Sequence, residues 1–293
     1  MIKRTVDVSA RGAHVSISDG QLLVREGEDL LGRVPVEDLG VLTLSTTAVT
    51  ITNAAVCALL NAGTVIVPCG DDHLPAGLVL PQNGALQVQR LRQQINAGKP
   101  LQKRLWQQIV RAKIHAQANV LHDRPEAKAL RELAKEVRSG DTTNREAQAA
   151  RRYWLALFGK DFRRAPDGAP PNNLLNYGYM ALRAAVARAV ASVGLHPSLG
   201  LHHTNRSDTF CLADDLIEPL RPLVDRRVRE LHESGCEEVN RHSKAVLLGV
   251  LSATVRSSEG TGPLLVAVER MVASLVECFE KKRRRLEIPV TCN

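Results

Sequence analysis

Short segments with a two-residue alternation of apolar and polar side chains dominate the first 80 residues. Glycine, aspartate and serine separate these segments, which are RTVDVS (4–9), AHVSIS (13–18), QLLV (21–24), VLTLS (41–45) and TVIVP (64–68). This period is typical of strands with one buried face. One helix is predicted at 52–62, between the last two segments. The N-terminal part is therefore expected to be mostly β.

The pattern changes after Pro81. Apolar residues then recur at intervals of 4, 3, 4 and 4 in the series Leu105, Ile109, Ala112, Ala116 and Val120. This spacing is typical of a helix with one buried face, and helical patterning continues to about residue 285. We therefore predict an α+β fold: a β-rich domain at 1–85, a linker at 86–100 and a larger all-α domain at 101–293.

The longest uncharged run, 39–70, contains too many threonine, serine and asparagine residues for a membrane span, and we interpret it as a buried strand–helix–strand unit. No secretion signal is apparent, because Asp7 and Arg11 follow Met1-Ile2-Lys3-Arg4 without an apolar stretch. The six cysteines form no CxxC pair, which favours reduced thiols over a metal cluster or disulfide framework. A cytoplasmic protein that does not contact a membrane is expected.

The net charge of +8 is unevenly distributed. Residues 1–72 carry five Lys/Arg and nine Asp/Glu, whereas the remainder carries 34 against 22. No acidic residue occurs at 73–122, which contains Arg90, Arg92, Lys99, Lys103, Arg104, Arg111 and Lys113. Such a segment favours a polyanion partner, although a solvated helix face is the alternative. Because only 3% of residues are aromatic, base stacking is disfavoured and contacts with a nucleic-acid backbone are expected.

Candidate chemistry is concentrated in the segment 194–222, GLHPSLGLHHTNRSDTFCLADDLIEPLRP. Asp215 and Glu218 are three residues apart, so on a helix they share one face. They are either ligands of an ion or the two acidic positions of a helix cap, although Pro219 fits a cap poorly. On the residues alone, His203 is more typical of a hydrogen-bonded surface histidine than of a ligand.

Glu146 also has two interpretations. It lies three residues after Thr143, as in a capping box. It also continues an apolar face with Ala150, Tyr153 and Leu157, and an inward carboxylate needs a partner. A divalent cation would be such a partner, and carboxylates with an imidazole suit Mg²⁺ or Mn²⁺. Both interpretations stay open on the sequence pattern alone.

The whole chain resembles the CRISPR-associated endonuclease and integrase (Cas-one) family. The resemblance rests on a strand-rich start and on four segments: NREAQAARRYW around Glu146, NNLLNYGYMALRAAVARAV at 172–190, GLHPSLGLHH at 194–203 and LADDLIEPLRPLVD at 212–225. The paired histidines with LADDLIEPLRP are most similar to members of Cas9-type (type II) systems. This chain departs from many relatives by its second histidine and by Glu, instead of Asp, at 218.

The resemblance implies that Glu146, His203 and Glu218 are catalytic and bind Mg²⁺ or Mn²⁺. Asp215 would contribute to the site or support it, and the role of His202 is open. The implied fold is an N-terminal β-sandwich followed by a helical domain. The implied partners are double-stranded DNA (protospacer and CRISPR repeat), a second copy of the chain and a Cas-two subunit, with the Cas9-type effector as a further candidate.

The implied activity is metal-dependent joining of short DNA fragments into the CRISPR repeat array by phosphodiester transfer. One alternative is a metal-dependent nuclease that hydrolyses branched or double-stranded DNA without joining it. The other is a DNA-binding scaffold without catalysis, in which the carboxylates only cap helices.

Overall fold

Two β-sheets form the N-terminal part of the computed structural model, which describes residues 4–71, 76–81, 86–205 and 207–291. The first sheet is parallel and has the order β1-β5-β7. The second has the order β4-β3-β2-β6 and contains an antiparallel meander. Their strands are β1 (Arg4–Val8), β2 (His14–Ser18), β3 (Gln21–Glu26), β4 (Asp29–Pro35), β5 (Leu39–Leu44), β6 (Thr50–Ile51) and β7 (Val65–Pro68).

The two sheets share one hydrophobic core with helix α1 (Asn53–Asn61). Leu22 of β3, Leu42 of β5 and Leu59 of α1 all belong to it and are fully buried. The Thr52 hydroxyl accepts a hydrogen bond from the N–H of Ala55 and so caps α1. The strand–helix–strand interpretation of the run 39–70 is confirmed by β5, α1 and β7. The segments predicted as strands correspond to β1, β2, β3, β5 and β7, whereas β4 and the two-residue β6 were not predicted.

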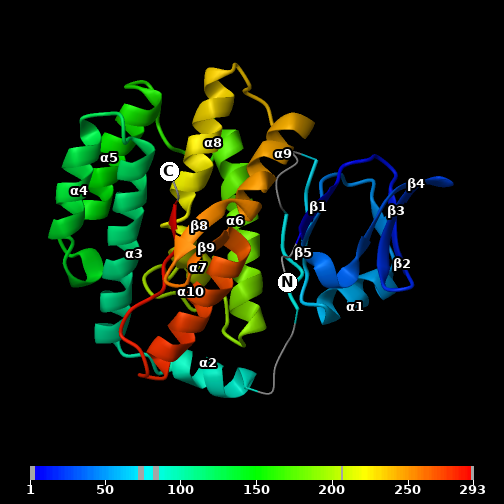
Figure 1. Cartoon of the computed structure of the whole chain (residues 1–293), viewed down its shortest axis with the longest axis horizontal. Helices are drawn as coiled ribbons and strands as arrows, with labels where there is room; N and C mark the ends of the chain where they lie inside the picture. The colour runs from blue at the N-terminus through cyan, green and yellow to red at the C-terminus, as the bar shows by residue number, and fades with distance from the viewer. Residues whose placement is uncertain (1–3, 72–75, 82–85, 206, 292–293) are drawn as a thin grey trace.

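Strand β5 connects the N-terminal sheets to the helical part. All six of its residues are buried, because the sheet β1-β5-β7 is covered on both faces. On one face of this sheet, Leu42 and Ile66 join the core between the sheets, and on the other face Val41 and Val65 join the helical core. Figure 1 shows this sheet between the other strands and the long helix α6.

The remaining chain is mostly helical and is built around α6, most of whose residues are buried. Its helices are α2 (Gln87–Ile95), α3 (Lys99–Val120), α4 (Glu126–Glu136), α5 (Arg145–Phe158), α6 (Asn172–Ser192), α7 (Cys211–Ile217), α8 (Arg221–Glu233), α9 (Arg241–Leu248) and α10 (Leu264–Phe279). Short 3-10 helices occupy Val36–Asp38, Ser139–Asp141 and Gly249–Ser252.

The mixed helix and strand content agrees with the predicted fold class, but the prediction of an all-α C-terminal part is wrong. A three-stranded sheet of order β10-β8-β9 lies within it, formed by β8 (Thr254–Ser257), β9 (Gly260–Pro263) and β10 (Val290–Thr291). The turn SEG at 258–260 closes the β8–β9 hairpin, where Gly260 adopts a positive φ that favours glycine. Helix α2 lies within the predicted linker 86–100, and the domain boundaries stay a prediction.

Two sequence interpretations concern the surroundings of the chain. In the described part of the structure, no helix is both long and apolar enough to cross a membrane. The five described cysteines are free thiols, as expected, while Cys292 lies outside the described residues.

Candidate metal centre and basic groove

Helix α3 carries a lysine into the interior of the helical part. Lys113 lies seven residues after Trp106 and four after Ile109, both buried, so the three residues share one face. Its Nζ atom is 2.6 Å from Oε1 of Glu146 and 2.5 Å from Oε2 of Glu218. Lys113 therefore joins two of the three residues predicted as metal ligands, and it does not lie on the solvated face that the all-basic segment suggested.

Glu146 lies in the first turn of α5, yet it does not cap that helix. The carboxylate of Asp141 accepts hydrogen bonds from the backbone N–H groups of Arg145 and Glu146, at 2.9 and 3.0 Å. Asp141 thus binds N–H groups that otherwise lack a partner at a helix start. The capping-box interpretation of Thr143 and Glu146 is wrong, and the Glu146 side chain is directed to Lys113 instead.

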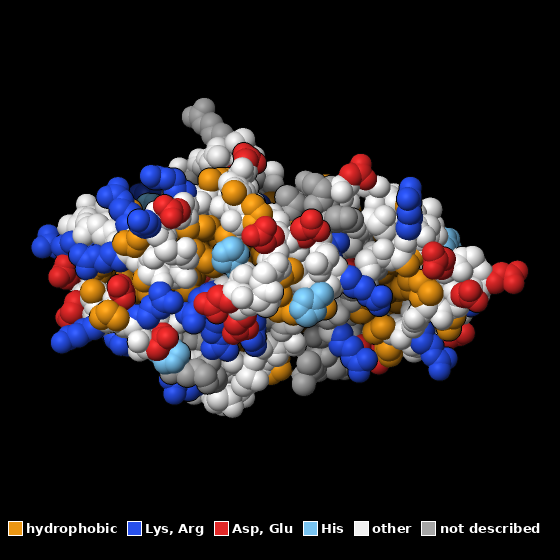
Figure 2. All heavy atoms as spheres, turned by 90° about the horizontal axis from the view of Figure 1, so that it is seen from above, with side chains coloured by type: hydrophobic (Ala, Val, Ile, Leu, Met, Phe, Trp, Pro, Cys, Tyr) orange, Lys and Arg blue, Asp and Glu red, His pale blue; other side chains and the backbone are white. Residues whose placement is uncertain are grey.

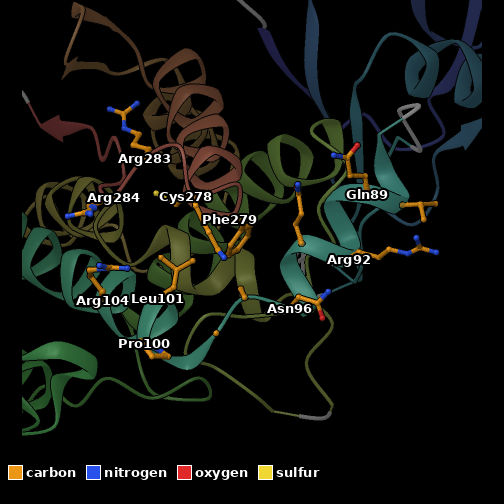
Figure 3. Close-up of a pocket in the computed structure, with 15 residues that line it drawn as sticks. Gln89, Arg92, Asn96, Pro100, Leu101, Arg104, Cys278, Phe279, Arg283 and Arg284 are labelled. Atoms are coloured by element: carbon orange, nitrogen blue, oxygen red, sulfur yellow. The ribbon is translucent and has the colours of Figure 1, made fainter.

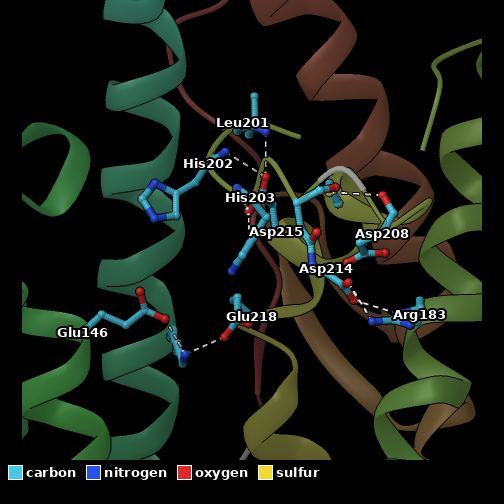
Figure 4. Close-up of polar contacts among 12 residues, drawn as sticks. Glu146, Arg183, Leu201, His202, His203, Asp208, Asp214, Asp215 and Glu218 are labelled. Carbon is cyan, nitrogen blue, oxygen red and sulfur yellow. Dashed lines mark hydrogen bonds and ion pairs between the residues drawn. The ribbon is translucent and has the colours of Figure 1, made fainter. Parts of the chain in front are cut away.

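Glu218 directly follows α7, and its side chain is only 5% exposed. Besides Lys113, its carboxylate faces Arg221, whose Nη2 atom is 3.2 Å from Oε1. Burial alone would raise the pKa of Glu218, but the positive charges of Arg221 and Lys113 outweigh it and lower the pKa to about 2. Glu218 is therefore a permanently charged carboxylate at neutral pH. Figure 4 shows it across from Glu146.

Asp215 is fully buried and holds the loop that precedes α7. Its carboxylate accepts hydrogen bonds from the backbone N–H groups of Leu201, His202 and His203, at 2.6, 2.9 and 3.3 Å. Since Asp215 lies inside α7, its interpretation as the N-cap in a box with Glu218 is wrong. The loop also needs Gly200, because a Cβ atom there would lie 2.4 Å from the carbonyl oxygen of His203.

The imidazole of His203 is fixed by the same carboxylate. Nδ1 of His203 is 2.6 Å from Oδ1 of Asp215, and the side chain is 45% exposed. This hydrogen bond is the main cause of a raised pKa of His203, to which the charges of Asp215, Glu218 and Glu146 add against partial burial. Nδ1 is thus occupied by Asp215, which leaves Nε2 as the ring nitrogen available to a ligand.

His202 has a different environment from that of His203. Its ring stacks on the indole of Trp106, with centroids 4.2 Å apart and planes within 2° of parallel. Trp106 also contacts the His203 ring edge to face at 5.7 Å. We infer from this packing that His202 supports the loop that carries His203.

A second set of buried groups lies behind Glu218. The Arg221 guanidinium lies over the ring of Tyr179, 4.8 Å from its centroid. The hydroxyls of Tyr179 and Tyr153 both donate to the carboxylate of Asp225, which is 1% exposed. Burial raises the pKa of Asp225 to about 7, although the two hydroxyls and Arg221 act in the opposite direction. No sequence pattern had indicated this cluster.

Asp214 is bound by an arginine of α6. Its two oxygens each lie 2.7 Å from a nitrogen of Arg183 in a bidentate ion pair. Burial raises its pKa to about 6, and this ion pair opposes the rise. Asp214 thus binds Arg183 of α6, whereas Asp215 binds the loop that carries His203 (Figure 4).

The donor set fits a divalent metal in chemistry, with one rearrangement. Glu146 and Glu218 both reach one cation, and His203 keeps a free ring nitrogen beside them. Two carboxylates and an imidazole suit Mg²⁺ or Mn²⁺. As the side chains lie, however, no three His, Cys, Asp or Glu side chains in the described ranges could hold one ion together. Metal binding by Glu146, His203 and Glu218 would therefore need these side chains to rearrange.

A groove of about 1050 Å³ lies elsewhere in the helical part. It is formed by α2, the start of α3 and the segment that follows α10, and we call it the basic groove. Of its described lining residues none is acidic, whereas five are basic: Arg92, Arg104, Lys281, Arg283 and Arg284 (Figure 3). By contrast, basic and acidic side chains are intermixed over the helical part on the face shown in Figure 2.

A smaller cavity of about 420 Å³ is lined by His203 and, like the basic groove, by Phe279. Gln94 of α2 forms part of its wall. The Gln94 side chain donates to the carbonyls of His196 and Leu199 and accepts the N–H of His196, each at 2.9 Å. Helix α2 therefore fixes the loop that leads to His203.

Comparison with known proteins gives a consistent result. The family model of the CRISPR associated protein Cas1 matches residues 6–250. The chain is 40% identical to the CRISPR-associated endonuclease Cas1 of Neisseria meningitidis, over 95% of this chain and 93% of that protein. It is 28% identical to a CRISPR-associated endonuclease Cas1 of Pyrobaculum aerophilum, over 93% and 98%.

Solved structures share the fold at low identity. A casposase bound to integration product matches with a TM-score of 0.79 at 19% identity, over 98% of this chain and 93% of that one. A CAS1 protein from Thermotoga maritima matches with a TM-score of 0.69 at 17% identity, over 94% and 97%. Because the family model and the Neisseria relative each cover most of the chain, we conclude that this chain belongs to the Cas1 family of CRISPR-associated endonucleases.

Proposed function

We propose that this Cas1-family endonuclease joins short DNA fragments to the CRISPR repeat by metal-dependent phosphodiester transfer. The observation that carries the proposal is the convergence of Glu146 and Glu218 on one cation beside His203. In this reaction the 3′-hydroxyl of a fragment attacks a phosphodiester of the repeat and releases a 3′-hydroxyl of the repeat strand. The number of phosphodiester bonds is conserved, so the reaction needs no external energy source.

Glu146, Glu218 and Nε2 of His203 are the residues that we propose to hold Mg²⁺ or Mn²⁺. A bound ion of this kind would stabilise the negative charge that develops on the reacting phosphate and on the leaving oxygen. The two carboxylates supply anionic oxygens that such ions prefer. A neutral imidazole as third ligand leaves the site less negative than a third carboxylate would, which eases the approach of a DNA backbone.

The other residues of the centre keep these three in position. Asp215 holds Nδ1 of His203 and three N–H groups of its loop, which fixes the ring and leaves Nε2 free for a ligand. Arg221, stacked on Tyr179, holds one oxygen of Glu218. Because every one of these contacts forms within the protein, His203 and Glu218 are held in position before DNA binds.

We propose that the basic groove binds the DNA backbone. Arg92, Arg104 and Arg284 line it and form no salt bridge with a described residue, so their charges are available to phosphates. The cavity lined by Phe279 and His203 places one of the proposed ligands beside a residue of the groove wall. Contacts of this kind fix the position of DNA without reading its sequence.

The partners follow from the family and from the neighbouring structures. One matching structure is a Cas6-RT-Cas1–Cas2 complex, with a TM-score of 0.76 over 98% of this chain and 36% of that one. This likeness supports a Cas-two subunit as partner, and the casposase with its integration product supports joining of DNA ends. A homodimer as the working form and contact with a Cas9-type effector remain predictions from the family resemblance.

An integration assay tests this proposal against hydrolysis. The purified protein and its Cas-two homologue are incubated with a labelled fragment, a plasmid carrying the repeat, and Mg²⁺ or Mn²⁺. The proposal predicts labelled plasmid, in which fragment and repeat are covalently joined. Cut ends without joined product would instead identify a metal-dependent nuclease, and neither product would favour a DNA-binding scaffold.

A further inference from the structure

Lys113 lies at the position where the proposed function needs a metal ion. Its Nζ atom is within 2.6 Å of an oxygen of Glu146 and of Glu218, and its side chain is only 13% exposed. We propose that the Lys113 ammonium is a built-in cation, which holds the two carboxylates together in the metal-free protein and which a divalent cation must displace. This inference rests on the proposed function, because only there do both carboxylates bind a metal.

The geometry requires one cation to replace the other. A metal ion bound to both carboxylates lies about 2.0–2.6 Å from an oxygen of each. The ammonium of Lys113 already lies at a similar distance from the carboxylates of Glu146 and Glu218, so the two cations would occupy nearly the same position. Lysine suits such exchange, since its charge is compact and ends a flexible four-carbon stem.

The charges explain why a metal-free site needs this lysine. Glu218 has a second partner in Arg221, but Glu146 forms no other ion pair with a residue in the described ranges. Without Lys113, two carboxylates would face each other in a poorly hydrated interior and repel one another. The lysine therefore stabilises the assembled site, and by the same contact it weakens binding of the metal.

The first experiment compares Lys113→Met with wild type in calorimetric titrations with MnCl2. Only the fraction of molecules whose lysine has moved away can bind the ion, so the observed affinity is reduced by that fraction. We expect Lys113→Met to bind Mn²⁺ at least about tenfold more tightly. We also expect it to melt several degrees lower without metal and to gain more than wild type when Mn²⁺ is added.

The matched control is Lys128→Met, which removes an exposed lysine of the neighbouring helix α4. It should leave the Mn²⁺ affinity and the melting temperature unchanged. An equal or weaker Mn²⁺ affinity of Lys113→Met would contradict displacement.

The second experiment uses the wild-type protein, so it does not depend on the folding of a variant. Lysines are acetylated with an N-hydroxysuccinimide ester, with EDTA or with saturating MnCl2, and the rate at each lysine is measured by mass spectrometry. Displacement predicts that Mn²⁺ speeds acetylation of Lys113 at least about threefold, because the ammonium leaves its ion pairs, while Lys128 is unaffected. An unchanged rate at Lys113 in saturating Mn²⁺ would overturn the inference.

These results separate this inference from the proposed function. If neither wild type nor Lys113→Met binds Mn²⁺, the metal site itself is contradicted. If both bind Mn²⁺ with equal affinity and Lys113 stays protected, the metal site stands and only the displacement is refuted.

Discussion

The two charged regions of the helical part differ in how their charges are balanced. Around the candidate metal centre the charged groups have partners of opposite sign, in the pairs Lys113–Glu218, Arg221–Glu218 and Arg183–Asp214. In the basic groove, Arg92, Arg104 and Arg284 form no salt bridge with a described residue. Balanced charges fix positions within the protein, whereas unbalanced ones attract a partner that lies outside it.

This difference also predicts how each region responds to mutation. Loss of one member of a buried pair leaves the other member uncompensated, which disturbs local structure and chemistry together. Loss of an unpaired surface cation alters attraction to DNA and leaves the fold intact. The following predictions are ordered from the largest expected effect to the smallest, and each tests one side of the difference.

His203→Ala should have the largest effect. It removes the ring nitrogen that we propose as a metal ligand, and joining of fragments should fall by more than the roughly 10- to 100-fold that loss of an outer partner costs. The fold should persist, since the ring is 45% exposed. Joined product in the integration assay and the thermal melting curve measure both effects. The control His202→Ala should be milder, and a wild-type joining rate for His203→Ala would exclude His203 as a ligand.

Asp215→Asn should reduce joining by about 10- to 100-fold, because the amide presents N–H groups to backbone N–H groups that now bind a carboxylate. It should also lower the raised pKa of His203, whose main cause is this carboxylate. Since only a neutral imidazole can bind a metal, the joining rate of wild type should rise with pH through that pKa. The pH–rate profile of Asp215→Asn should therefore shift to lower pH. An unshifted profile would assign Asp215 a purely structural role.

The triple variant Arg92→Glu, Arg104→Glu and Arg284→Glu tests the unbalanced region. If each arginine contacts a phosphate, the slope of log affinity against log salt should become less steep by about 0.9 per lost contact on duplex DNA. Fluorescence anisotropy across a salt series measures the slope and the affinity. Mn²⁺ binding should be unaffected, since none of the three belongs to the metal centre.

The control for this triple changes net charge by the same amount elsewhere, through Arg11→Glu, Arg33→Glu and Lys160→Glu at exposed positions. It should reduce DNA affinity less and keep the slope. Equal slopes for wild type and both triple variants would show that the DNA is held outside the basic groove.

Asp225→Asn should have the smallest effect, and only on stability. The pKa of this buried acid is raised to about 7 in the folded protein, against about 4 when unfolded. Between these values the unfolded state releases the proton and the folded state keeps it, so wild-type stability falls as pH rises from about 4 to 7. The neutral amide lacks this loss. As pH rises from about 4 to 7, the melting temperature of the variant should increase by a few degrees relative to that of wild type. If the difference in melting temperature stays constant over this range, the raised pKa is contradicted.

Much of the fold could be predicted because local patterns and burial agree in the strands and in α1. The helix cap at Thr52 and the alternation in β2 are purely local signals. The pattern does not predict strand β4, because its adjacent apolar residues Leu30 and Leu31 are both exposed and break the two-residue alternation. The strands β8 and β9 are four residues each, too short for periodicity to distinguish them from a loop within a helical region.

The candidate site was only partly predictable. The phase of Glu146 correctly indicated an inward carboxylate, but the choice between a metal and another partner depends on Lys113, 33 residues earlier in the chain. Lys113 was grouped with cations expected to contact DNA, although its spacing from Ile109 already put it on the buried face of α3. No sequence pattern distinguishes an ion pair across two helices from a metal ligand, because both need an inward charged group.

The sheet β1-β5-β7 is buried on both faces, which affects how the protein folds and whether its parts can be separated. Alternate residues of β7 belong to different cores: Val65 and Val67 pack with the helices, and Ile66 packs between the sheets. Neither half can be removed without exposing an apolar face of the same sheet to water. The chain is therefore expected to melt in a single cooperative transition, and a helical fragment that begins after residue 85 would expose the surface on which this sheet now rests and aggregate.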